Sequence, residues 1–204
     1  MKFLRTPDER FSKLAGYPFS PNYAEVSDAE GGILRIHYID EGDDNAVTVL
    51  MMHGEPSWSY LYRKMIPIVT AAGFRVIAPD LVGFGKSDKP SERSDYTYER
   101  HVNWIQSWLD EIGLKEINLV CQDWGGLIGL RLLANDPDRF TSAVVANTGL
   151  LTGDHRVSDA LLNWRKFSLE TEDFDVGSII AMGCKKDVPQ DVMAAYNAPF
   201  PDDT

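Results

Sequence analysis

The sequence has 204 residues, of which 44% are hydrophobic, and this length suits one globular domain with a sizeable core and room for an insertion. Its 31 acidic and 20 basic residues leave a net charge of −11, which argues against nucleic acid or an anionic membrane as a partner. No apolar run approaches the roughly 20 residues that span a bilayer, and residues 1–11 lack the apolar core of a signal peptide. The two cysteines, Cys121 and Cys184, offer no disulfide framework, so a reduced cytoplasmic location is expected.

Residues 1–21 are polar, contain three prolines and are expected to form an extended arm with little structure of its own. Short apolar segments then alternate with longer amphipathic segments. Strands are expected at residues 23–26, 33–39, 47–52, 74–78, 117–122 and 142–146. Helices are expected at residues 58–72, 96–112 and 127–134. This alternation predicts an α/β fold, in which a mostly parallel sheet has helices on both faces.

Three histidines fall on or beside these elements. His37 lies on the polar side of the alternating strand 33–39 and is expected at its surface, without a chemical role. His53 follows strand 47–52 and is expected to shape the next turn rather than to act as a base. His101 is expected on the surface of its helix, and Ser57 is the candidate N-cap of helix 58–72.

The segment from residue 117 to residue 126 carries the strongest signal. An apolar run with β-branched members ends in Cys121-Gln122-Asp123-Trp124-Gly125, and a helical pattern follows. One small residue, Cys121, lies two positions before the central aspartate, and another, Gly125, lies two positions after it. Strand and helix can therefore meet in a sharp turn. The pattern resembles the nucleophile elbow of α/β-hydrolases, with Asp123 where the better-known motif has serine.

An aspartate at the elbow indicates a particular chemistry. A carboxylate is already an anion at neutral pH and can attack a carbon atom directly to form an ester. Attack on saturated carbon must expel a halide or open an epoxide, and water must then hydrolyse the ester with help from a general base. The tetrahedral anion of that second step needs an oxyanion hole. The backbone N–H groups of Glu55 and Trp124 are the candidates, because Pro56 has no N–H.

Residues 150–204 show no segment with the β-branched density of the earlier strands. Helices are expected at residues 157–169, 176–184 and 190–196. We therefore predict an α/β core at residues 1–149 and a helical lid at residues 150–204, which would exclude water from the elbow.

Three segments resemble the haloalkane dehalogenases: His53 to Arg63, Asp80 to Pro90, and Gln122 to Gly126. The match is to the subgroup with glutamate after His-Gly and a second halide-binding tryptophan in the lid, and it extends from about residue 23 to the end. The resemblance implies that Asp123 is the nucleophile and that the indole N–H groups of Trp124 and Trp164 bind the departing halide. It also implies a small halogenated alkane and water as substrates, with no cofactor and no metal.

The sequence departs from this family in one respect. The family carries its general-base histidine, and in this subgroup its acidic partner, on loops after two further strands. None of the four histidines matches that position, and His155, at the start of the lid, is only a weak substitute. The chain therefore resembles a C-terminally truncated dehalogenase that lacks the last strands of the fold and stops at the ester. Strand 142–146 would then leave an open apolar edge through which the chain could self-associate.

Two alternatives remain open from the sequence. An epoxide hydrolase shares the aspartate elbow and the His-Gly-x-Pro loop, and it would use a lid tyrosine such as Tyr196 to protonate the epoxide oxygen. An inactive α/β-hydrolase fragment would persist only by pairing with another chain through its open edge.

Overall fold

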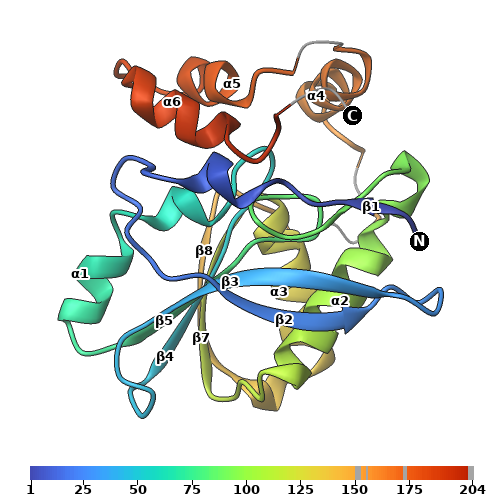
Figure 1. The fold of residues 1–204 in the computed structure, drawn as a ribbon. Helices are drawn as coiled ribbons and strands as arrows, with labels where there is room; N and C mark the ends of the chain where they lie inside the picture. Colours follow the sequence, from blue (N-terminus) through green and yellow to red (C-terminus); the bar gives the residue numbers. More distant parts are fainter. Residues whose placement is uncertain (150–152, 155, 172–173, 202–204) are drawn as a thin grey trace.

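The computed structural model describes residues 1–149, 153–154, 156–171 and 174–201 (Figure 1). The strands are β1 (Phe3–Leu4), β2 (Asn22–Ser27), β3 (Ile33–Glu41), β4 (Thr48–Met52), β5 (Arg75–Pro79), β6 (Lys89–Pro90), β7 (Ile117–Gln122) and β8 (Phe140–Ala146). The α-helices are α1 (Ile66–Ala71), α2 (Tyr98–Glu111), α3 (Trp124–Asn135), α4 (Asp159–Glu170), α5 (Val176–Met182) and α6 (Gln190–Asn197).

Six strands form the main sheet in the order β2-β3-β5-β4-β7-β8. Strands β5, β4, β7 and β8 run parallel to one another, whereas β2 pairs with β3 and β3 with β5 in antiparallel fashion. Each strand expected from the sequence is present within two residues of its predicted bounds. The predicted mostly parallel sheet with helices on both faces is thereby confirmed (Figure 1).

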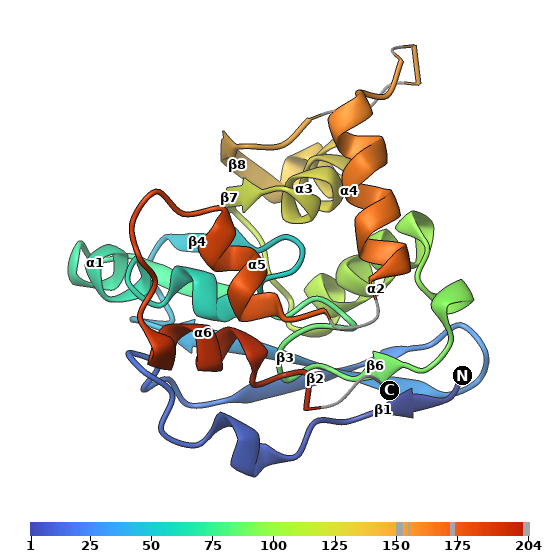
Figure 2. The same ribbon diagram turned by 90° about the horizontal axis from the view of Figure 1, so that it is seen from above.

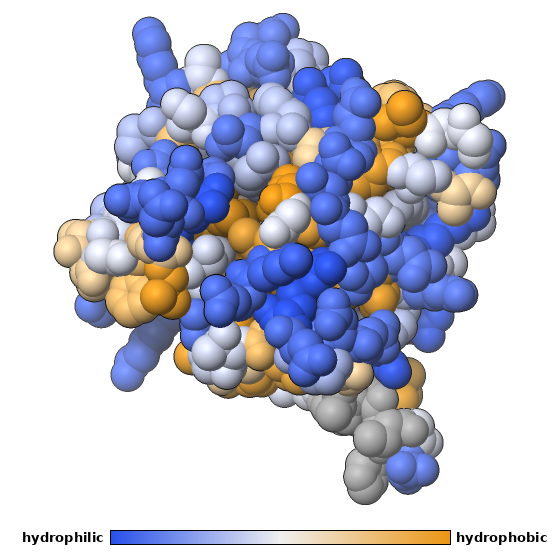
Figure 3. Space-filling view, turned by 90° about the horizontal axis from the view of Figure 1, so that it is seen from below, coloured by the Kyte–Doolittle hydropathy of each residue, from blue (hydrophilic) through white to orange (hydrophobic). Residues whose placement is uncertain are grey.

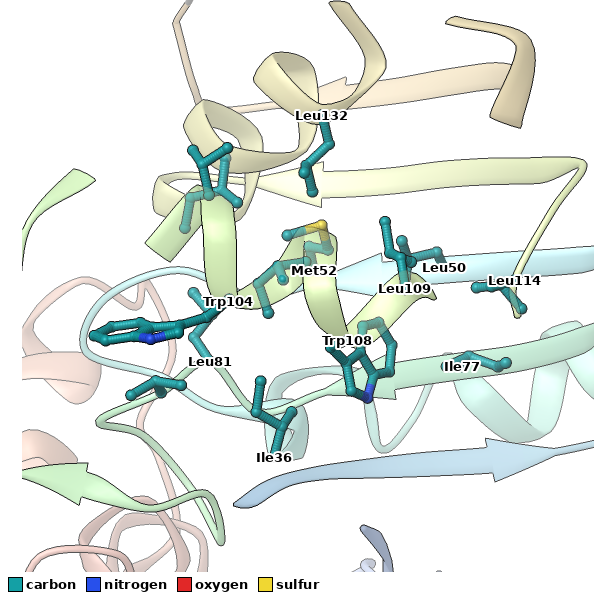
Figure 4. Close-up of a cluster of buried hydrophobic side chains, with 14 of the residues drawn as sticks. Ile36, Leu50, Met52, Ile77, Leu81, Trp104, Trp108, Leu109, Leu114 and Leu132 are labelled. Carbon is teal, nitrogen blue, oxygen red and sulfur yellow. The ribbon is translucent and has the colours of Figure 1, made fainter. Parts of the chain in front are cut away.

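Alternate residues of β4 enter two separate hydrophobic cores, because successive side chains of a strand point to opposite faces. Leu50 and Met52 pack with Trp108 and other residues of α2 and α3 (Figure 4). Val49 and Met51 face the core that contains the first residue of α1. The side chain of Trp108 is fully buried in the first of these cores.

The N-terminal arm is more structured than its sequence predicts. β1 pairs with β6, and a 3₁₀ helix follows at Asp8–Phe11. Phe11 and Tyr17 are buried against the indole of Trp58. The hydroxyl of Thr6 donates a hydrogen bond to the carbonyl of Pro199 at 2.6 Å, so the arm also contacts the end of the chain.

The helix expected at residues 58–72 is broken in two. A 3₁₀ helix covers Ser59–Tyr62, and α1 begins only at Ile66. Pro67 explains the break, because proline is tolerated in the first turn of a helix but not in its interior. Ser57 is not the N-cap that we predicted; its hydroxyl instead donates to the carbonyl of Gly54 at 2.9 Å.

Helices α4, α5 and α6 lie above the carboxyl ends of the strands (Figures 1 and 2). Ser158 and Asp175 cap α4 and α5 by accepting hydrogen bonds from backbone N–H groups. In the part of the chain that the structure describes, no strand follows β8. The three expected lid helices are thus present, while the division into two domains at residue 150 stays a prediction.

Two surfaces of the molecule differ in character. The side opposite the lid helices is mainly hydrophilic, with small separate hydrophobic patches (Figure 3). Strand β8 lies at the edge of the sheet with Val144 60% exposed and Val145 48% exposed. Within the described ranges, none of the helices has the length and apolar character to cross a bilayer.

Candidate active site

Asp123 occupies the turn between β7 and α3. Its φ of 53° and ψ of −127° place a non-glycine residue on the left-handed side of the Ramachandran plot, a conformation that costs on the order of 1–3 kcal/mol. The surrounding backbone holds it there: the carbonyl of Asp123 accepts hydrogen bonds from the N–H of Gly126 at 2.9 Å and from the hydroxyl of Thr148 at 2.7 Å. This strain at a tight strand–helix junction is what the sequence pattern predicts.

The small residues around Asp123 are required by close backbone contacts. A Cβ atom on Gly125 would collide with the carbonyl oxygens of Met52 and His53. A Cβ atom on Gly54 would collide with the side chain of Asp123. Glycine therefore lets α3 and the loop after β4 approach the elbow from two sides.

Glu55 and Asp123, which are 68 residues apart in the sequence, meet at this point. The backbone N–H of Glu55 donates a hydrogen bond to Oδ1 of Asp123 at 2.8 Å. Burial and the charge of Asp123 raise the pKa of the Glu55 carboxyl, while a hydrogen bond with the Trp124 side chain opposes them. One carboxylate oxygen of the candidate nucleophile is thus hydrogen-bonded to the Glu55 amide, which we expect to form half of an oxyanion hole.

A cavity of about 220 Å³ lies in front of the elbow. It is lined by Glu55, Leu81, Phe84, Tyr96, Thr97, His101, Trp124 and Ile128. The walls are mainly apolar and aromatic, with a few polar groups, as in ligand sites that accept small organic molecules.

His37 is buried, contrary to our expectation of a surface residue. Its Nδ1 lies 2.7 Å from Oδ2 of Asp80, and its backbone N–H donates to the hydroxyl of Ser87 at 2.9 Å. The loop after β5 therefore covers the polar side of β3. A pattern within one strand cannot reveal a cover that comes from about 50 residues downstream.

Asp80 is the centre of this buried network. It accepts hydrogen bonds from the backbone N–H groups of Ser59 and Lys86, each at 2.8 Å. Burial alone would raise the pKa of its carboxyl, but His37, His53 and the amide of Lys86 hold that pKa well below its usual value. Asp80 thereby ties β3 to the loop after β4.

His53 has the turn-shaping position that its place in the sequence predicts. Its Nε2 accepts a hydrogen bond from the N–H of Leu81 at 2.9 Å, and its Nδ1 lies 3.0 Å from the carbonyl of Gly54. Full burial lowers the pKa of His53. Both ring nitrogens are thus engaged with backbone groups.

His101 was expected on the surface of its helix, and this expectation is wrong. Only 8% of the residue is exposed, and its ring packs against Trp104 at 5.3 Å and Trp124 at 6.2 Å between centroids. Burial, and then the proximity of His53, lowers the pKa of His101 to about 4. The spacing of Tyr98, His101 and Trp104 did contain a signal, because residues three apart lie on one side of a helix.

Trp164 lies on α4 and is not among the described residues that line the cavity. Its indole packs against Phe167 at 5.7 Å and Phe174 at 6.3 Å between centroids. The structure thus brings Asp123, Glu55 and Trp124 together but leaves Trp164 in an aromatic cluster of the lid helices. His155 falls outside the described residues. Among the residues that are described, no cluster of three or more acidic, histidine or cysteine side chains could hold a metal ion.

Comparison with known proteins agrees with this geometry. Residues 47–180 match the family model of the alpha/beta hydrolase fold. A haloalkane dehalogenase of Psychrobacter cryohalolentis is 59% identical over all 204 residues, which span 67% of that relative. One from Mycobacterium marinum is 49% identical over 202 residues, or 99% of this chain and 68% of the relative.

A solved structure gives the same result. The tetrameric haloalkane dehalogenase of Paraglaciecola agarilytica superposes with a TM-score of 0.91 at 45% identity, covering 99% of this chain and 67% of that one. Fold and site thus define a hydrolase of the α/β-hydrolase fold. Within that class, the chain belongs to the haloalkane dehalogenases, enzymes that act on carbon–halogen bonds.

The contact at Gly125 generates a prediction. Gly125→Ala forces a methyl group against two backbone carbonyls that cannot move without displacing β4, so we expect the free energy of unfolding to fall by about 3 kcal/mol. Urea denaturation followed by circular dichroism measures this change. Gly149→Ala is the matched control, because a Cβ atom there meets no atom of the described residues within 4 Å. Equal stability of the two variants would contradict the close packing of the elbow.

Proposed function

We propose that Asp123 is the nucleophile of this dehalogenase. The observation that carries the proposal is the 2.8 Å hydrogen bond from the Glu55 amide to Oδ1 of Asp123, at a strained elbow beside an apolar cavity. This bond orients the carboxylate. An oxygen of Asp123 attacks the halogen-bearing carbon; a C–O bond forms, the carbon–halogen bond breaks, and the halide leaves with the bonding electron pair.

The departing halide needs hydrogen-bond donors in a site with little water. An indole supplies one N–H from a large apolar body, so it can bind a weakly hydrated anion without adding charge. Trp124 follows the nucleophile directly and lines the cavity. Trp164 is the second donor in this proposal, which requires α4 to bring its indole towards the cavity when the lid closes over the substrate.

Hydrolysis of the ester completes the reaction. Water attacks the carbonyl carbon of the Asp123 ester, a base takes the proton, and the amides of Glu55 and Trp124 stabilise the oxyanion until the alcohol leaves. Within the described residues no histidine suits the role of base: His37 is paired with Asp80, His53 binds two backbone groups, and the low pKa of His101 makes it a weak base. We therefore expect this 204-residue chain to stop at the ester.

The first step can be tested by mass spectrometry. After incubation with 1-bromobutane, we expect the Cys184→Ser variant to gain one butyl group on the peptide that contains Asp123 and to release one bromide per chain. The Cys184→Ser background removes the exposed thiol, which could also be alkylated. Asp123→Asn in the same background should gain no butyl group. An adduct of equal yield in both variants would exclude Asp123 as the nucleophile.

The halide site makes a separate prediction. Loss of a hydrogen bond to an ion costs about 1.5–3 kcal/mol, so Trp124→Phe and Trp164→Phe should each raise the bromide dissociation constant by at least about tenfold. Isothermal titration calorimetry with sodium bromide measures this constant.

Phe167→Leu is the control for Trp164, because it disturbs the same aromatic cluster without removing an indole N–H. If Trp164→Phe and Phe167→Leu change bromide binding equally, Trp164 is a packing residue of the lid.

Epoxide hydrolysis is the less favoured reading. It would need a tyrosine of the lid to protonate the epoxide oxygen. Tyr196 instead packs edge-to-face on Tyr60 at 5.1 Å and does not belong to the described cavity lining. The relatives at 49% and 59% identity are dehalogenases.

We further propose that the chain self-associates through the edge of β8. A second copy fits this edge because edge strands carry unpaired backbone groups, and Val144 and Val145 are exposed there. The related enzyme from Paraglaciecola is itself described as a tetramer. A cytoplasmic location and a lid domain at residues 150–204 also remain predictions.

Sedimentation velocity tests the edge. We expect the chain to sediment as a dimer or larger species and Val144→Lys to shift it towards the monomer, since a charged edge residue opposes strand pairing. Val47→Lys is the matched control, because Val47 is 57% exposed but lies outside β8. A monomer at all concentrations would rule out this interface.

A further inference from the structure

His101 has a position in the cavity that packing alone does not explain. The residue lines the same cavity as Trp124 and Glu55, and its ring contacts the rings of Trp104, Trp124 and Tyr96. Its Nδ1 is buried and has no hydrogen-bond partner among the described residues. A buried polar atom without a partner destabilises the fold, whereas a phenylalanine would fill similar space without that cost.

The ring is uncharged at neutral pH when the cavity holds no anion. Burial lowers the pKa of His101 to about 4, and the nearby ring of His53 adds to this effect. A neutral imidazole carries one N–H, and the unpartnered Nδ1 favours the tautomer with the proton on Nε2, because a buried acceptor costs less than a buried donor. The cavity wall therefore contains a neutral imidazole, that of His101, at neutral pH.

Several groups face His101 and set its electrostatic surroundings. From the loop after β4 come the carboxyl of Glu55, which lines the same cavity, and the ring of His53, which contributes to the lowered pKa of His101. From the segment before α2 come the phenol of Tyr96, whose pKa burial raises, and the hydroxyl of Thr97. When Asp123 becomes an ester, its negative charge passes to the halide beside Trp124.

We propose that His101 is a positioning residue of the halide site, which packs against the Trp124 indole and binds a proton more tightly when a halide ion occupies the cavity. This inference rests on the proposed halide role of Trp124. The ring centroids of His101 and Trp124 are 6.2 Å apart, and both residues line one cavity. An anion about 6 Å from the imidazolium stabilises it enough to raise its pKa by roughly one.

Halide binding should therefore strengthen as the pH falls, because the imidazole of His101 becomes protonated. A group whose pKa rises by roughly one on binding, from about 4, lowers the bromide dissociation constant about threefold between pH 7 and pH 4.5. Glu55 and Asp123 would add their own dependence, because protonation removes a repulsive charge. Asp123→Asn with Glu55→Gln replaces both carboxyls by neutral amides and leaves His101 to be observed.

The test compares this double variant with and without His101→Asn. Bromide dissociation constants are measured by calorimetry at pH 7 and pH 4.5, with near-ultraviolet circular dichroism to confirm the fold at each pH. We expect about threefold tighter binding at pH 4.5 when His101 is present and no change when it is absent. His53 is common to both proteins, so its contribution cancels. His101→Phe is the second variant, which keeps the aromatic packing but cannot be protonated.

A direct measurement needs no substitution at His101 and so does not depend on how the His101 variants fold. In the double variant, the NMR titration of the His101 ring should shift to higher pH when bromide is added. Parallel bromide curves with and without His101, or an unshifted titration, would overturn the inference and leave the halide site intact. Absence of bromide binding in both proteins would overturn the inference together with the proposed halide site, whereas butylation of Asp123 would still support the proposed nucleophile.

Discussion

The contact between the Glu55 amide and the Asp123 carboxylate is the point on which the site depends. It joins the loop after β4 to the turn after β7, two segments that meet only because their strands are adjacent and parallel. The carboxyl ends of such strands lie at one edge of the sheet, where ligands bind in open α/β folds. The strained backbone of Asp123 is tolerated because its carbonyl is held by α3 and by Thr148.

A buried polar network around Asp80 and His53 supports that contact. Asp80 accepts the N–H of Ser59, and His53 accepts the N–H of Leu81, so the loops after β4 and β5 hold each other in place. These groups are engaged by backbone donors and are therefore poor candidates for chemistry. The buried polar residues of this site are of two kinds: a satisfied framework around Asp80, and the imidazole of His101 in the cavity wall, whose Nδ1 has no partner among the described residues.

The lid helices are held by the remainder of the chain. The indole of Trp58 donates to the carbonyl of Ala195 at 3.2 Å, and Thr6 of the N-terminal arm donates to Pro199. These bonds fix α6 and the segment after it, while α4 stands apart from them in Figure 2. Trp164, which is not among the described residues that line the cavity, belongs to α4, the lid helix with no buried residue of its own.

The sequence by itself determined the order of strands and helices, the elbow and the identity of Asp123, Glu55 and Trp124 as a group. Each depends on a local pattern: β-branched runs, small residues at fixed spacing, and a proline that excludes its own amide. Only the tertiary structure decided that His37, His101 and parts of the arm at residues 1–21 are buried. Their burial comes from segments distant in the sequence, namely the loop after β5, the elbow tryptophan and the lid. The sequence pattern around a polar residue indicates which face of its strand or helix it occupies. Whether that face is covered depends on segments that pack against it in the tertiary structure.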